Sequence, residues 1–175
     1  GDYPHGLRMS PDGSAIYVAN VQDGTVSVID TTALSEVARI KVGVAPVQVG
    51  FTPDGKRVYV SLRDENKVAV IDTQSREVIA RINVGRSPIQ VYATPDGRLV
   101  YVANQGTETE PDETVSVIDV VGGNVVKTIQ TDKGAHGVTV VADGAFVFVT
   151  NIVAGTVSQI DVGSQSVVKT YAVGK

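Results

Sequence analysis

The sequence repeats itself four times at a nearly constant spacing, and this repeat constrains the fold more than any other feature. The segment PDGSAIYVANVQDGTVSVID at residues 11–30 returns as PDGKRVYVSLRDENKVAVID at residues 53–72. Related segments follow at residues 95–119 and 142–161. The aspartates that end the four segments are Asp30, Asp72, Asp119 and Asp161, spaced 42, 47 and 42 residues apart. A fixed period of this length indicates a repeat architecture such as a solenoid or a propeller.

Each repeat contains four short runs rich in β-branched residues, and turn residues separate these runs. This pattern predicts four strands per repeat, with Pro11-Asp12-Gly13 as the first tight turn. The strands are expected over 4–10, 15–20, 25–30 and 37–42; over 46–52, 57–62, 67–72 and 78–84; over 88–94, 99–104, 114–119 and 125–131; and over 135–141, 146–151, 156–161 and 167–173. No window has helical spacing, so no helix is predicted.

Four antiparallel strands in about 42 residues are typical of one blade of a β-propeller. We therefore predict an all-β propeller of four blades within one array over residues 1–175. The blades are expected over residues 1–42, 43–84, 85–131 and 132–173. Both ends of the sequence fall on a repeat boundary, which favours either a fragment of a larger ring or half of a dimeric eight-bladed ring, and closure of the four blades alone is a third alternative. Open edges of the outer blades would then allow a homodimer.

Composition excludes several classes of function. The net charge is −4, and the basic residues are scattered, which argues against a nucleic-acid partner. Apolar runs reach five residues, so no membrane span is expected. Cysteine is absent, which excludes disulfides, thiolate metal sites, covalent c-type haem attachment and cysteine nucleophiles. Motifs of hydrolases, phosphate-binding loops and zinc proteases are also missing, so the sequence favours a protein that is not an enzyme and has no cofactor.

The repeat resembles a known family. The pattern PDG-x-x-[VI]-YV-x-N, followed by TVSVID and then V-x-x-x-I-x-VG-x-x-P, is similar to the YVTN-type β-propeller repeats, with the best matches at residues 17–20 and 101–104. The resemblance covers all four repeats. It implies a seven-bladed ring in surface-layer, secreted or periplasmic proteins, and hence an extracellular, cell-surface or periplasmic location.

One position breaks the repeat in a chemically informative way. The opening of the first strand has the only two histidines, His5 and His136, each followed by glycine, whereas Gln48 and Gln90 stand beside it in the other two repeats. First strands of blades line the central channel, so these four residues are candidates for a ligand site at its mouth. Two imidazoles could bind a transition metal or titrate near neutral pH. The alternative is that each histidine bonds the backbone of a neighbouring blade, which we favour because no third ligand is evident.

Other acidic groups have simpler interpretations. The repeated aspartates each follow a strand and are expected to bond the backbone of the next turn. The third repeat has a longer connection, residues 105–113, which is expected on the same face as the channel mouth. Its acids could contact a partner or a calcium ion, although a solvated loop is favoured because they lack the spacing of a calcium loop; they are Glu108, Glu110, Asp112 and Glu113.

The sequence therefore predicts a non-catalytic binding or scaffold module of an exported or cell-surface protein, with a protein or cell-envelope component as partner. Two alternatives remain open. The chain could be part of the propeller of a periplasmic oxidoreductase that holds haem d1 or a quinone cofactor, for which His5, Arg8, Tyr92 and His136 are the available channel residues. It could also be a metal-binding propeller that uses His5 and His136.

Overall fold

The computed structural model describes residues 1–174 and shows an all-β molecule of four separate four-stranded sheets. Strands follow one another within each sheet as antiparallel neighbours. Blade 1 contains β1 (Pro4–Met9), β2 (Ala15–Asn20), β3 (Thr25–Asp30) and β4 (Ser35–Lys41). Blade 2 contains β5 (Pro46–Phe51), β6 (Arg57–Leu62), β7 (Lys67–Asp72) and β8 (Glu77–Asn83). Blade 3 contains β9 (Pro88–Ala93), β10 (Leu99–Gly106), β11 (Pro111–Asp119) and β12 (Asn124–Gln130). Blade 4 contains β13 (Ala135–Val140), β14 (Phe146–Asn151), β15 (Thr156–Asp161) and β16 (Ser166–Ala172).

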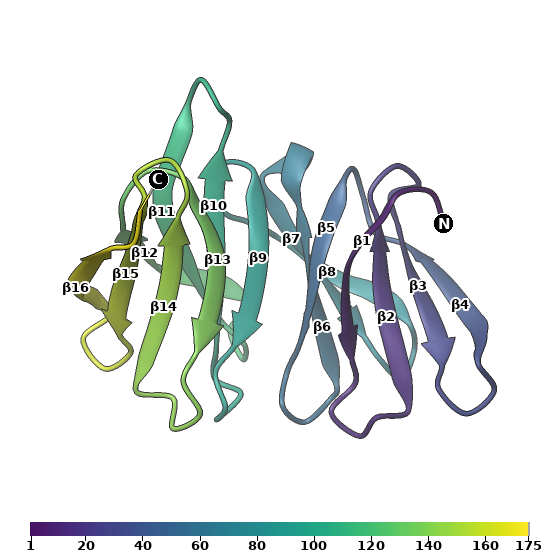
Figure 1. The fold of residues 1–175 in the computed structure, drawn as a ribbon. Coiled ribbons are helices and arrows are strands. Elements are labelled where there is room, and N and C mark those ends of the chain that lie inside the picture. Colours follow the sequence, from purple (N-terminus) through teal and green to yellow (C-terminus); the bar gives the residue numbers. More distant parts are fainter. Residues whose placement is uncertain (175) are drawn as a thin grey trace.

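The four blades stand side by side in chain order, with blades 1 and 4 at the two ends of the array (Figure 1). The first strands β1, β5, β9 and β13 are the innermost elements, and each contacts the next along the series. The predicted propeller architecture with four antiparallel strands per blade is therefore confirmed.

Hydrophobic packing occurs between blades and leaves no core inside a single sheet. Three clusters fill the three seams, where a seam is the interface of two adjacent blades. In the first seam, Tyr17 and Val28 of blade 1 pack with Val60, Leu62 and Ile71 of blade 2. Both faces of an internal blade are thus buried, which explains why its strands are nearly continuous runs of apolar residues.

A buried polar motif recurs in three blades and explains the Asn of the repeat. The Asn104 amide donates hydrogen bonds of 3.0 Å to the hydroxyls of Thr114 and Ser116 on the neighbouring strand. The same pair of bonds is made by Asn20 and by Asn151. In blade 2 the three positions change together, to Leu62, Lys67 and Ala69, so no buried donor is left without a partner.

Several strand boundaries differ from the prediction. The first strand of each blade ends one residue earlier than predicted. The fourth strands lie one or two residues earlier than predicted, because each contains a β-bulge opposite the third strand. The predicted nine-residue connection in blade 3 is wrong, since β10 and β11 extend into it and leave a turn at residues 107–110. A 3-10 turn at Arg63–Glu65 is the one helical element within the described residues, where none was predicted.

Candidate functional site

The candidate site is the channel that the four innermost strands line. His5 and His136 are the second residues of β1 and β13, and Gln48 and Gln90 are the third residues of β5 and β9. All four side chains therefore lie near the strand starts, at one end of the channel. We call this end the channel mouth.

His5 bonds the neighbouring blade, as the favoured interpretation of the sequence predicts. Its Nδ1 lies 3.1 Å from the carbonyl oxygen of Val47 in β5. The following Gly6 explains the His-Gly pair, because a Cβ there would lie 2.4 Å from the same oxygen. The absence of a side chain at this position thus lets β1 approach β5 closely. The His5 side chain is exposed, and its second ring nitrogen takes no part in this hydrogen bond.

His136 is half-buried at the opposite side of the mouth. Burial lowers the pKa of its imidazole, and the charge of His5 lowers it further. Within residues 1–174 no group of three His, Cys, Asp or Glu side chains has the arrangement of a metal site. The metal-binding interpretation of the histidine pair stays a prediction.

Both glutamine side chains accept backbone hydrogen bonds at the mouth, and that of Gln90 connects two strands. The side-chain oxygen of Gln90 accepts a 3.0 Å hydrogen bond from the backbone N–H of Val138 in β13. The side-chain oxygen of Gln48 accepts one from the N–H of Val49, next to it in β5. These bonds fix the orientation of both amides in the unbound chain.

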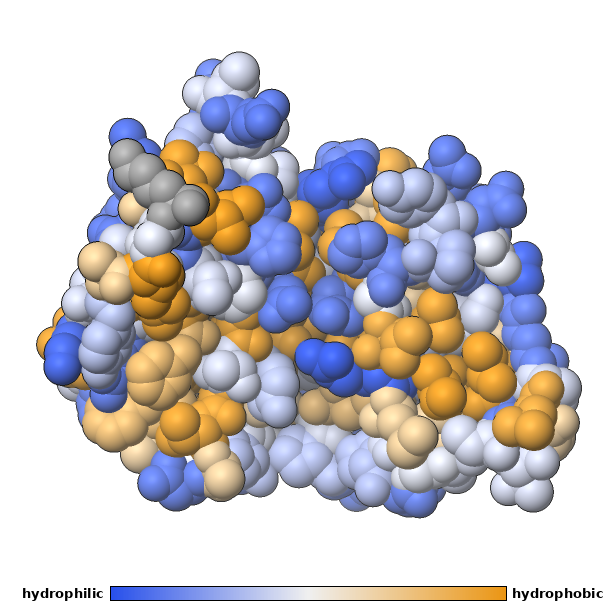
Figure 2. All heavy atoms as spheres, viewed as in Figure 1, coloured by the Kyte–Doolittle hydropathy of each residue, from blue (hydrophilic) through white to orange (hydrophobic). Residues whose placement is uncertain are grey.

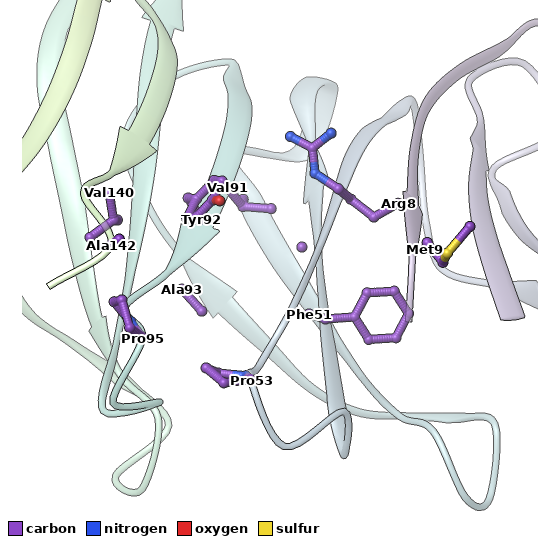
Figure 3. Close-up of a pocket in the computed structure, with 11 residues that line it drawn as sticks. Arg8, Met9, Phe51, Pro53, Val91, Tyr92, Ala93, Pro95, Val140 and Ala142 are labelled. Atoms are coloured by element: carbon purple, nitrogen blue, oxygen red, sulfur yellow. The ribbon is translucent and has the colours of Figure 1, made fainter. Parts of the chain in front are cut away.

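A cavity of about 300 Å³ lies further along the channel (Figure 3). Arg8 and Tyr92 line it, as the sequence suggested for channel residues, together with apolar groups such as Met9, Phe51 and Val91. His5 and His136 are not among the lining residues. Sequence reasoning missed the apolar members, because a valine or phenylalanine in a β-strand gives no sign of whether it faces a seam or the channel.

The extended connection in blade 3 forms a hairpin that protrudes at the same end as the channel mouth (Figure 1). Glu108 and Glu110 are exposed, and Glu113 is half-buried. Asp112 is buried, so a wholly solvated loop is wrong. Its carboxylate accepts a 2.9 Å hydrogen bond from the backbone N–H of Arg86 and a 2.7 Å bond from the hydroxyl of Thr114. Asp112 thereby joins the base of the hairpin to the chain that enters blade 3.

The aspartates at the strand ends serve the turns that follow them. The Asp30 carboxylate accepts hydrogen bonds from the backbone N–H groups of Thr32 and Ala33, at 2.8 and 2.7 Å. Asp72, Asp119 and Asp161 bond their own turns in the same way. These contacts account for the repetition of the aspartate without a ligand.

Sequence comparison places the chain among known propellers. The model of the YNCE-like beta-propeller family matches residues 57–175. The chain belongs to the YNCE-like beta-propeller family. The model of the Cytochrome D1 heme domain also matches this YNCE-like chain, over residues 4–93. A propeller family is thereby confirmed, whereas the narrower YVTN resemblance stays a prediction. No curated protein matches the sequence significantly.

Among solved structures, a chain of the Kuenenia stuttgartiensis Hydrazine Synthase is similar to this YNCE-like propeller, with a TM-score of 0.92 and 29% identity. The match covers 98% of this chain and 49% of that chain. The chain described here thus spans about half the length of its structural neighbour. No helix among the described residues has the length and apolar character needed to span a membrane.

Proposed function

We propose that this chain is a non-catalytic binding module of an exported protein, and that its docking face is the end of the array with the channel mouth and the blade 3 hairpin. One observation carries the proposal. Residues that depart from the repeat and lie outside the apolar seam clusters gather at this end: they are His5, His136, Gln48, Gln90 and the hairpin that presents Glu108 and Glu110. Stiff blades hold these groups in fixed positions, which lowers the entropy lost when a partner docks.

The partner that suits this face is a protein or cell-envelope component. Polar side chains at a fixed mouth and an acidic hairpin beside it favour a polar or basic surface over an apolar one. The similarity to the hydrazine synthase chain and the match to a haem domain support a redox assembly as the setting, in which this propeller would be a structural subunit.

Site-directed photo-crosslinking in a cell-envelope extract of the source organism tests this proposal. A photoreactive amino acid at Gln90 should give a discrete crosslinked product that depends on ultraviolet light. The matched control carries the same group at Thr128 on the outer strand β12, far from the mouth, and should give none. Equal products from both positions, or none from Gln90, would contradict the proposal.

The second candidate is a propeller that holds haem d1 or a quinone. The match of residues 4–93 to the haem domain favours it. The geometry of the described residues does not fit a haem: the two imidazoles lie at the mouth, outside the 300 Å³ cavity, and the cavity has Arg8 as its one cationic lining residue. A haem titration followed by visible absorption decides between the candidates. A protein-dependent Soret band that disappears in His136→Ala would support the second candidate and count against the first.

A further inference from the structure

The cavity in the channel has walls that the three internal seams hold in place. Phe51 packs on the cluster of the first seam, and Val91 belongs to the cluster of the second. Tyr92 packs on the cluster of the third seam, to which Val140 belongs. The volume of about 300 Å³ is at the lower end of the range of small-molecule sites in proteins. The cavity is therefore preformed by contacts between neighbouring blades, as such sites usually are.

The space within the cavity exists because one first strand lacks a side chain that the others have. One position of the first strands, paired with the same position of each second strand, is Arg8 in β1, Gly50 in β5, Tyr92 in β9 and Thr139 in β13. A Cβ on Gly50 would lie 2.9 Å from the carbonyl oxygen of Val91, so the close approach of β5 to β9 requires glycine. The same glycine leaves the space between Arg8 and Tyr92 open.

The guanidinium of Arg8 is the one charged group among the described residues that line the cavity. Figure 3 shows its side chain extending from β1 toward the side on which Tyr92 lies. No ion pair within the described chain includes Arg8, and its hydrogen bond to the carbonyl oxygen of Leu7 is long, at 3.5 Å. The cavity thus combines one positive charge that no described carboxylate neutralises, one phenol and apolar walls.

An organic anion with one carboxylate and a small apolar body complements these groups. A guanidinium donates two parallel hydrogen bonds to a carboxylate, and the hydroxyl of Tyr92 can donate another. The apolar body would lose its contact with water against Phe51 and Val91, which favours binding. Inorganic phosphate or sulfate fits less well, because a single guanidinium does not replace the hydration that such an ion loses.

We propose that this cavity binds a small organic monocarboxylate, with the carboxylate on Arg8 and Tyr92 and the apolar body against Phe51 and Val91. The site is distinct from the channel mouth, because neither His5 nor any other candidate residue of the mouth lines it. The inference goes beyond the proposed function and does not depend on it. A partner could dock at the mouth without a ligand in this cavity, and the reverse also holds.

Isothermal titration calorimetry of the chain with phenylacetate tests the proposal. Binding should be saturable, with one site per chain and a sub-millimolar dissociation constant. Phenylacetamide has the same shape without the charge, and it should bind roughly tenfold more weakly. Arg8→Gln should weaken phenylacetate binding by roughly tenfold while leaving phenylacetamide binding unchanged, because it removes the charge-assisted hydrogen bonds. Tyr92→Phe should weaken phenylacetate binding by roughly threefold, the effect of one neutral donor.

The matched control is Arg98→Gln, which removes an exposed arginine that does not line the cavity. It should leave the dissociation constant for phenylacetate unchanged, and circular dichroism should show that all variants are folded. Inorganic phosphate at the same ionic strength should not compete with phenylacetate. The proposal would be overturned by titrations without saturation, by equal affinity for the acid and the amide, or by wild-type affinity in Arg8→Gln. Equal losses in Arg8→Gln and Arg98→Gln would overturn it too, because they would indicate attraction by overall charge.

Discussion

Tyr101 lies at the centre of the third seam, fully buried, and its hydroxyl has no hydrogen-bond partner among the described residues. Burial raises the pKa of this phenol to about 12. A buried hydroxyl without a partner destabilises the folded state, because it has lost its bond to water. The equivalent residue in blade 4 is Phe148, which lacks the hydroxyl.

Tyr101→Phe should therefore increase the free energy of unfolding by about 1 kcal/mol, measured by urea denaturation. Tyr59→Phe is the matched control, because Arg57 interacts with the Tyr59 hydroxyl at the same position of blade 2. That substitution should leave stability unchanged or reduce it. A destabilised Tyr101→Phe variant would show that its hydroxyl has a partner in solution.

His136 predicts a pH dependence of stability. Its pKa is lowered in the folded chain, first by burial and then by His5, so the unfolded chain binds the proton more tightly. Stability should be complete above the unfolded pKa of about 6.5 and should fall as the pH decreases through that value. His136→Gln should flatten this dependence between about pH 5 and 7, measured by thermal unfolding. His5→Gln is the control, and it should remove only the smaller contribution. An unchanged profile in His136→Gln would contradict the assignment.

At the scale of elements, the Asn–Thr–Ser motif connects the second and third strands of three blades. Asn104→Leu should destabilise the chain by about 1 to 3 kcal/mol, because it leaves the hydroxyls of Thr114 and Ser116 without their donor. Adding Ser116→Ala should recover part of the loss, since blade 2 uses Leu62 with Ala69. Chemical denaturation of the single and double variants measures the coupling. Strictly additive effects would show that the motif does not act as a unit.

Most strands could be predicted from the sequence, because turn residues and β-branched runs coincide at each boundary. The fourth strands were misplaced because a bulge adds a residue without any sequence signal as clear as Pro-Asp-Gly. The hairpin of blade 3 was not predicted, because residues 105–113 were expected to form a solvated connection, whereas Pro111 begins a strand and the buried Asp112 accepts a hydrogen bond from the backbone N–H of Arg86. Long-range contacts of this kind do not follow from local pattern.

The candidate site could be predicted only in part, because some of its contacts are also long-range. The two histidines could be placed at one end of the channel, since their repeat position is shared. A hydrogen bond from His5 to the backbone of a neighbouring blade was one of two interpretations of the sequence. The structure shows this bond, with the carbonyl of Val47 as the partner. The hydrogen bond from Val138 to Gln90 depends on the close approach of β9 and β13, which sequence spacing does not specify.

At the scale of the whole molecule, stability depends on seams rather than on individual blades. A cut in a connection within one blade should therefore leave the fold intact. A glutamate-specific protease should cleave after Glu108, which is exposed at the tip of the hairpin, whereas the bond between Glu110 and Pro111 should resist cleavage. The two pieces should remain together in native size-exclusion chromatography and separate under denaturing electrophoresis. Dissociation under native conditions would show that the β10–β11 pairing and the adjacent seams do not hold the nicked chain.

The tip at residues 107–110 projects beyond the strands of every other blade and touches no seam cluster. Blade 3 has already accepted additional residues here while its sheet kept the common register. A foreign epitope spliced into this turn would consequently be displayed to antibodies without disturbing propeller assembly. The same position would suit a fluorophore for following the molecule in living cells.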